Sequence, residues 1–422
     1  MRKPAETRLR TDLTLFDATA ISLGAIIGGG IFVVTGIVAG LAGSALVVSI
    51  LLASVVSLFT ALSFVELVLW APAEGGGYEF ACKLISPFAG FMVGWMWIVA
   101  NLFSGAAVSL GFAHYLASLF PSVPLNLAVV LLCFAFTILN YFGIEHSARF
   151  NNFLVVTKIA ILLLFVGVGV FHFHTANLAG PLQSGRGILY GAYYIFFAFA
   201  GFARVTLVAE EVKEAKKTVS KAIILSLAIS AIIYVLVGTT ALGLAGAGVL
   251  AGSKSPLSDA IKTVGNPVLV YLVSAGGLLA TASVLLTSIL GVSRMMFAMS
   301  RRSDLPAVLG RLHRRFKTPD ISVLLVGVLV TALALFFDLT RVAVLSTFAS
   351  LFYYAMANLS ALRLASTARV YPRLVPGVGL GTCLLLFLFV PGYLWPEGLV
   401  CLLAGVAYYW FKEWIAGLKA KA

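Results

Sequence analysis

Long apolar runs, separated by short polar segments, dominate this sequence and leave few folds open to it. The first run, Leu15–Leu41, is long enough to cross the hydrocarbon core of a bilayer, which takes about 20 residues as a helix. Of the 422 residues, 61% are hydrophobic and only 11% are charged, and the mean hydropathy is +1.05. Soluble globular domains are not this apolar. The sequence therefore predicts an all-α polytopic membrane protein.

About twelve membrane-spanning helices are predicted from these runs. The first apolar run is too long for a signal-peptide core and shows no small-residue cleavage pattern, so we expect an uncleaved first helix. The expected spans are Leu15–Leu41, Ala45–Trp70, Phe88–Phe120, Leu125–Phe142, Ala148–Phe173, Ile188–Glu210, Val219–Leu244, Pro267–Ser300, Ile321–Phe337, Val342–Leu364, Leu374–Pro391 and Leu394–Trp414.

The basic residues are placed as in a membrane protein with both ends in the cytoplasm. The net charge is +13, and 23 of the 29 Lys and Arg residues fall in segments that alternate with the apolar runs. This bias follows the positive-inside rule and puts both termini, including residues 1–12, in the cytoplasm. Membrane topology thus explains the basic charge, and we expect a multi-pass protein of the cell membrane with lipid, not nucleic acid, around it.

A glycine-rich stretch, Gly24–Phe32, interrupts the middle of the first run. Each glycine inside a helix costs on the order of 1 kcal/mol relative to alanine, so the helix is expected to break here. A broken helix inside a membrane persists only where protein or a polar cavity surrounds it. Its free amides suit a carboxylate, and its free carbonyls suit an ammonium or a cation. The glycines alone are equally compatible with close helix packing through small residues.

A second interruption, Phe199–Phe202, lies in the sixth predicted span, five helices after the first. Paired broken helices at corresponding positions are the best sequence pointer to an inverted-repeat transporter and its substrate site. The predicted organisation is a cytoplasmic segment at 1–12, five-helix repeats at 13–173 and 187–365, and two further helices at 374–414.

Lys158 is the most informative ionisable residue. It stands about ten residues into the fifth predicted span, roughly 15 Å along the helix at about 1.5 Å per residue. That depth is too great for its side chain to reach water easily. A charge inside the membrane costs at least about 2.5 kcal/mol and marks a functional site by default. The alternative is a static tie between helices.

Four local patterns, spread over both repeats, carry a family resemblance. The chain resembles the amino acid–polyamine–organocation transporter superfamily, whose members have a leucine-transporter-like fold of five plus five helices with discontinuous helices 1 and 6. The patterns are Gly24–Phe32, Gly75–Tyr78 followed by Gly90–Trp95, Phe197–Lys217, and Arg294–Pro306 ahead of Thr318-Pro319.

The resemblance implies a substrate site at the two helix breaks. The amides of Gly29 and Gly30 would hold a substrate carboxylate. The carbonyls of Ile26 in helix 1 and of Phe197 and Ala200 in helix 6 would hold its amine. Phe197 occupies a position where family members often place an aromatic gate; packing is the alternative for a chain with 31 phenylalanines. The candidate substrate-binding residues are Ile26, Gly28, Gly29, Gly30, Phe197, Ala200 and Gly201.

The resemblance also implies a role for Lys158 in proton coupling. Some relatives have a lysine in helix 5 where sodium-coupled members hold an ion, and its ammonium is thought to replace the sodium. We therefore expect Lys158 to bridge the Gly24 carbonyl and Ser283 and to load and release the coupled proton. Nearby hydroxyls, including that of Ser283, are equally typical of ordinary hydrogen bonds between membrane helices.

Two departures from the family pattern bear on the substrate. Many members have an acidic residue two positions after the helix 6 glycine, where this chain has Ala203, so cationic substrates are disfavoured. Arg204 follows, and the sequence assigns it no role beyond reaching inward or pairing with a carboxylate. The segment Arg301–Pro306 lacks the Asp-Gly that is usual in the family, which weakens any transfer of loop details.

No enzyme, metal or cofactor signature accompanies these features. HExxH and Gly-x-Ser-x-Gly are absent, and the four cysteines form no CxxC pair. The sequence thus predicts a proton-coupled secondary transporter of small, uncharged L-amino acids that works by alternating access, without cofactor. Two alternatives stay open, a sodium-coupled symporter and a non-transporting amino acid sensor with the same fold.

Overall fold

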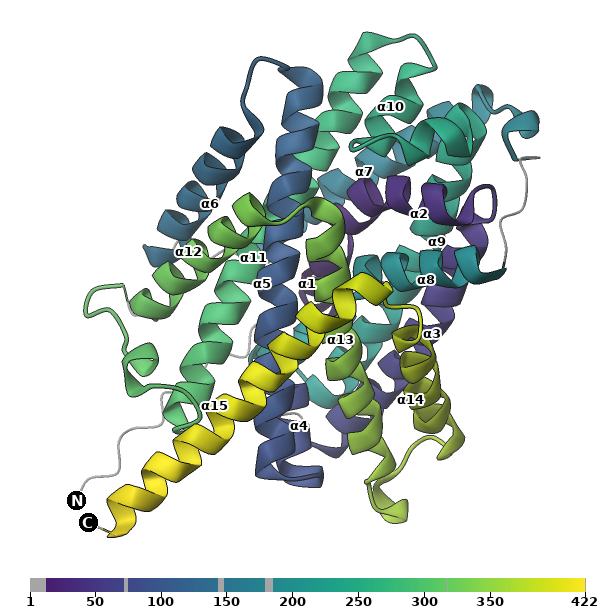
Figure 1. The fold of residues 1–422 in the computed structure, drawn as a ribbon. Coiled ribbons are helices and arrows are strands. Elements are labelled where there is room, and N and C mark those ends of the chain that lie inside the picture. The colour runs from purple at the N-terminus through teal and green to yellow at the C-terminus, as the bar shows by residue number, and fades with distance from the viewer. Residues whose placement is uncertain (1–12, 72–74, 143–147, 179–184, 317, 422) are drawn as a thin grey trace.

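The computed structural model describes residues 13–71, 75–142, 148–178, 185–316 and 318–421 (Figure 1). The segment 1–12, predicted to be cytoplasmic, lies outside these residues. In the first half of the chain the helices are α1 (Leu15–Ile26), the π-helical turn η1 (Gly30–Val34), α2 (Thr35–Ala42), α3 (Leu46–Trp70), α4 (Gly77–Leu84), α5 (Pro87–Leu119), α6 (Leu125–Tyr141), α7 (Ala148–Phe171) and η2 (Thr175–Leu178).

The second half continues the same architecture. Its helices are α8 (Gly185–Phe199), the 3₁₀ helix η3 (Phe202–Glu211), α9 (Ala215–Ala251), α10 (Pro256–Lys262), α11 (Pro267–Arg301), η4 (Ala307–Gly310), α12 (Asp320–Phe336), α13 (Leu339–Leu362), η5 (Ser366–Ala368), α14 (Leu374–Phe387), η6 (Gly392–Leu394) and α15 (Trp395–Lys421).

These helices confirm the predicted all-α membrane architecture. Nine helical segments of the described chain are long and apolar enough to cross a membrane, and α6, α12 and α14 are shorter apolar helices. Large apolar side chains such as Phe134, Phe171 and Phe336 are 65%, 87% and 82% exposed on the outside of the bundle. Exposed apolar rings of this kind suit a lipid-facing surface rather than water.

Local sequence signals account for where the first helix begins. The Thr14 hydroxyl accepts a hydrogen bond from the Asp17 amide, and the Asp17 carboxylate accepts one from the Thr14 amide. This reciprocal capping satisfies two amides that an uncapped helix start leaves unpaired. The cap therefore fixes the start of α1, which then runs for 12 residues up to the glycine-rich break.

Three connecting segments differ from the sequence-based expectation. The segment between the expected spans Ala45–Trp70 and Phe88–Phe120 is not only a loop, because α4 begins at Gly77 and buries Tyr78 and Phe80. Gly75 and Gly76 make the preceding turn with φ of 91° and 50°, a region that favours glycine. The helix α9 continues beyond the predicted end at Leu244, since Gly246 (φ 73°) bends the chain and helical structure resumes. A further short helix, α10, forms within the loop that follows.

The two predicted helix breaks are present and lie against each other. Gly201, which follows the end of α8, packs on the backbone of α1 so closely that a Cβ there would lie 2.5 Å from the Ala25 carbonyl carbon. Gly30, at the start of η1, packs equally closely on α8, where a Cβ would lie 2.3 Å from that of Ala198. Only glycine permits this approach at both crossings.

Two groups of helices meet at these breaks. In one group, α9 packs on α1 and α3, and α3 also packs on α8. In the other, α5 forms the central column between α11 and α13, with α6 and α12 side by side on its flank (Figure 1). The C-terminal helix α15 crosses the front of the view and packs on α5. The breaks in α1–η1 and α8–η3 thus face α5 and α11.

Candidate functional site

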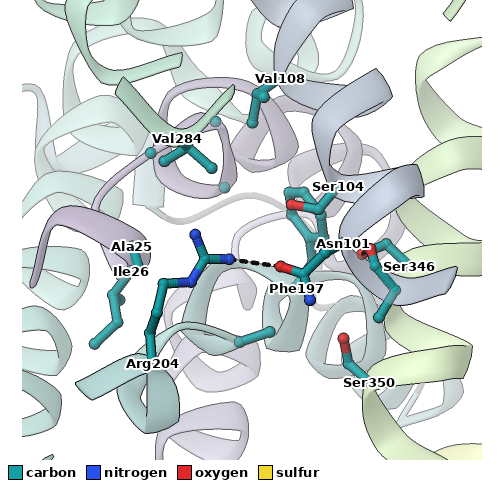
Figure 2. A pocket seen from close by; sticks show the side chains of 15 residues that line it. Ala25, Ile26, Asn101, Ser104, Val108, Phe197, Arg204, Val284, Ser346 and Ser350 are labelled. Atoms are coloured by element: carbon teal, nitrogen blue, oxygen red, sulfur yellow. Dashed lines mark hydrogen bonds between the residues drawn. The ribbon is translucent and has the colours of Figure 1, made fainter. Parts of the chain in front are cut away.

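A small cavity lies where the two helix breaks face α5, α11 and α13 (Figure 2). It measures about 30 Å³, room for no more than a few water molecules. The lining residues are Ala25, Ile26, Gly28, Gly29, Gly30, Ala100, Asn101, Ser104, Val108, Phe197, Ala200, Arg204, Val284, Ser346 and Ser350.

Six of the seven predicted substrate-binding residues line this cavity. They are Ile26, Gly28, Gly29, Gly30, Phe197 and Ala200. Gly201 does not line it and instead packs against the backbone of Ala25. The structure thus brings the two predicted half-sites together, with Gly201 providing the close crossing between them.

The backbone at the first break departs from the helix at Ile27, whose φ and ψ are −76° and 88°. Helical structure resumes at Gly30, which is preceded by Gly29. The first amides of a helix have no partner within it, so those that follow the break are available to an anionic group. The glycines on this side of the cavity carry no side chains of their own, and the side chains of Val284 and Val108 pack close to Gly28 and Gly29.

The carbonyl of Ile26, predicted to hold an amine, already accepts one hydrogen bond. The Tyr234 hydroxyl lies 2.7 Å from this oxygen and 3.0 Å from the carbonyl oxygen of Ala198. A carbonyl oxygen has two lone pairs, so one stays available. Tyr234, from α9, was not singled out from the sequence, and its fully buried ring joins the two broken helices.

Phe197 lies at the cavity with its side chain 8% exposed. Its carbonyl oxygen accepts from the Ala200 amide at 3.3 Å, which closes a tight turn at the end of α8. The position agrees with the expected gate, but packing against the cavity wall accounts for the same burial. The gating role stays a prediction.

Lys158 is fully buried and is held at both predicted contacts. Its Nζ lies 3.2 Å from the Gly24 carbonyl oxygen and 2.9 Å from Ser283 Oγ, and a third contact of 2.8 Å goes to the Ile27 carbonyl oxygen. An ammonium has three N–H donors, and these three acceptors match them. Gly24 lies in the last turn of α1 and Ile27 directly follows that helix, whereas Ser283 belongs to α11. Lys158 therefore connects the broken helix to the second group of helices.

Arg204 also points into the cavity, a position that the sequence left open (Figure 2). Its Nη2 lies 2.5 Å from Asn101 Oδ1 on α5, and its Nη1 lies 3.0 Å from Thr287 Oγ1 on α11. No carboxylate in the described part of the chain lies within ion-pair distance of this guanidinium. Of the two possibilities for Arg204, reaching inward or pairing with a carboxylate, the described structure shows the first.

Four more polar side chains at the cavity escaped the sequence analysis. Asn101 and Ser104 are three residues apart on α5, and Ser346 and Ser350 are four apart on α13. Such spacings place each pair on one helix face. Both pairs stand within otherwise apolar runs. Polar residues three or four positions apart in such runs are the signal from which a polar helix face could have been predicted.

Comparisons with known proteins agree with this architecture. The sequence profile of the family described as "Amino acid permease" matches residues 13–415. The chain is 36% identical to an uncharacterized transporter of Mycobacterium tuberculosis over 97% of this chain and 94% of that protein. It is 31% identical to a branched-chain amino acid permease of Bacillus subtilis, over 96% and 93%. It is also 29% identical to a methylthioribose transporter of Bacillus subtilis, over 97% and 96%.

The matches cover both broken helices, the described cavity and the flanking helices. This coverage agrees with the four sequence patterns and with the all-helical architecture. The chain therefore belongs to the amino acid permease family, within the amino acid–polyamine–organocation superfamily.

Proposed function

We propose that this protein is a proton-coupled secondary transporter of small L-amino acids that works by alternating access in the cell membrane. The cavity at two paired helix breaks is the observation that carries the proposal. The proposed substrates include uncharged amino acids such as alanine, whereas cationic ones are disfavoured because Ala203 stands where many relatives have an acid. The name of the related branched-chain amino acid permease agrees with an uncharged side chain.

In this proposal the amides of Gly29 and Gly30 bind the substrate carboxylate. Carbonyls at the ends of α1 and α8, including that of Ile26, bind its amine. The opposite polarity of the two helix ends orients the zwitterion between them. The cavity of about 30 Å³ then corresponds to a closed state, and rocking of one helix group against the other opens it to each side in turn.

Lys158 would couple this movement to protons. A lysine ammonium donates three hydrogen bonds, whereas a neutral amine has only two N–H donors. Loss of the proton removes one donor, so either Nζ releases one of its contacts to Gly24, Ile27 and Ser283, or the Ser283 hydroxyl turns from the Ala280 carbonyl to donate to Nζ. Because these contacts connect the broken helix to α11, deprotonation loosens the tie between the two helix groups, and reprotonation restores it.

The test is uptake of radiolabelled alanine into proteoliposomes under an inward proton gradient, without sodium. We expect Lys158→Ala to abolish gradient-driven accumulation, because the variant has no group to carry the proton at the break. Lys254→Ala, which alters an exposed lysine, is the matched control and should transport as the wild type does. Undiminished uptake by Lys158→Ala with its pH dependence intact would refute the coupling role.

The other outcomes separate the alternatives. Accumulation that requires sodium would favour the sodium-coupled symporter. It would also contradict proton coupling through Lys158, since an ammonium repels a nearby cation. Specific amino acid binding with no flux under either gradient would favour the sensor.

A further inference from the structure

Arg204 brings a positive charge into the cavity, and no lining residue of the described chain carries a negative one. It is the only charged side chain among the residues that line this cavity in the described chain. Its hydrogen-bond partners, Asn101 and Thr287, offer neutral oxygens. A guanidinium stays charged in proteins, so the cavity carries this charge at every physiological pH.

The buried acids of the described chain are engaged elsewhere. Glu66 accepts from the backbone amides of Val370 and Tyr371 at 3.1 and 3.3 Å. Glu79 pairs with Lys83 and Arg302 at 3.1 and 2.8 Å. Neither contacts Arg204. A second cation, Lys158, lies at the first helix break and is also bonded only to neutral oxygens.

The guanidinium also has donors to spare. It carries five N–H groups, and the two recorded side-chain contacts use one each from Nη1 and Nη2. Figure 2 shows it reaching from η3 toward the centre of the residues that line the cavity. Its planar fork matches a carboxylate, which it can bind through two parallel hydrogen bonds.

Building on the proposed function, we infer that Arg204 is a specificity residue for an anionic side chain and that acidic amino acids are preferred substrates. The glycine amides at the first break take the α-carboxylate, and the helix-end carbonyls take the amine. Arg204, on the second broken helix, then remains for a carboxylate on the substrate side chain. The same charge repels lysine-like and polyamine substrates.

The first arm of the test uses only the wild-type protein. Alanine uptake into proteoliposomes is competed with aspartate and glutamate and, separately, with asparagine and glutamine, which have nearly the same shape without the charge. We expect the acids to compete at least about tenfold better, the scale of one charge-assisted hydrogen bond. Equal or weaker competition by the acids would overturn the inference while leaving alanine transport in place.

The second arm compares Arg204→Gln with Arg186→Gln, which alters an exposed arginine at the start of α8. Arg204→Gln is expected to lower the ratio of glutamate to alanine uptake at least about tenfold, and Arg186→Gln to leave that ratio unchanged. An equal loss of both substrates in Arg204→Gln, in protein that still melts as the wild type does, would mean that Arg204 holds the carboxylate common to all of them. That result overturns the side-chain assignment.

Failure of the underlying proposal gives a different result. If wild-type protein neither binds nor transports any amino acid of either set, the amino acid transport function and this inference both fall. If alanine is transported and the acids are ignored, only the inference falls.

Discussion

Ser283 is the one partner of Lys158 that can be removed without touching the backbone, because the other two acceptors are the carbonyls of Gly24 and Ile27. Its hydroxyl accepts from Nζ and in turn donates to the Ala280 carbonyl at 2.9 Å. The Ser283 side chain, on α11, therefore binds the ammonium and is itself fixed by its hydrogen bond to the Ala280 carbonyl.

We expect Ser283→Ala to weaken proton coupling without abolishing uptake. The variant leaves one N–H of a buried ammonium unpaired, which costs about 1–3 kcal/mol and disfavours the protonated form. The pH at which alanine uptake is half-maximal should therefore move to lower pH. Ser54→Ala, whose hydroxyl bonds only its own helix at Ile50, is the control and should keep the wild-type profile. An unchanged profile in Ser283→Ala would show that this hydroxyl does not bear on the protonation step.

The broken helices depend on close crossings as much as on polar groups. The tightest crossing between the two broken helices is tested at Gly30. An added methyl group there would lie 2.3 Å from the Cβ of Ala198 and 2.4 Å from its Cα. Since backbone must move to make room, Gly30→Ala should separate η1 from α8 and destabilise the protein by about 1–3 kcal/mol or more.

Gly167 offers the matched control for this substitution. It lies within α7, and an added Cβ there would meet nothing within 4 Å. Gly167→Ala should preserve or slightly raise the melting temperature, because alanine favours a helix by about 1 kcal/mol over glycine. Thermal melting in detergent and alanine uptake are the two measurements. Wild-type behaviour of Gly30→Ala in both would contradict the close crossing.

Sequence reasoning located the helices and both breaks because hydropathy and glycine clusters act locally. The helix α4 escaped it, since its burial depends on packing against α5 and not on an apolar run of its own. The Gly246 bend escaped it as well, because a single glycine in an apolar run does not show whether the helix resumes beyond it.

Lys158 stood out as a lone charge in an apolar run, so its depth in the membrane could be predicted from the sequence. The direction of Arg204 could not, because hydropathy gives depth in the membrane but not rotation about the helix axis. The serines at the cavity were equally hidden, since a hydroxyl in a membrane helix commonly bonds its own backbone four residues earlier. Ser346, for example, bonds instead to the Ala100 carbonyl at 2.8 Å, a contact made 246 positions away in the chain.

In the proposed transport cycle, the two helix groups of the whole molecule move against each other around one cavity and one connecting lysine. The cavity lies between the groups, and Lys158 connects them at the break. Substrate entry and proton entry should therefore occur together, because both depend on the same closure. This dependence is a property of the assembled bundle and of no single helix.

The most direct measurement is proton entry during substrate uptake, followed with a pH-sensitive dye trapped inside sodium-free proteoliposomes. Addition of alanine outside should acidify the lumen with wild-type protein and with Lys254→Ala, and should not do so with Lys158→Ala. Alanine entry without acidification, or acidification that persists in Lys158→Ala, would contradict the account.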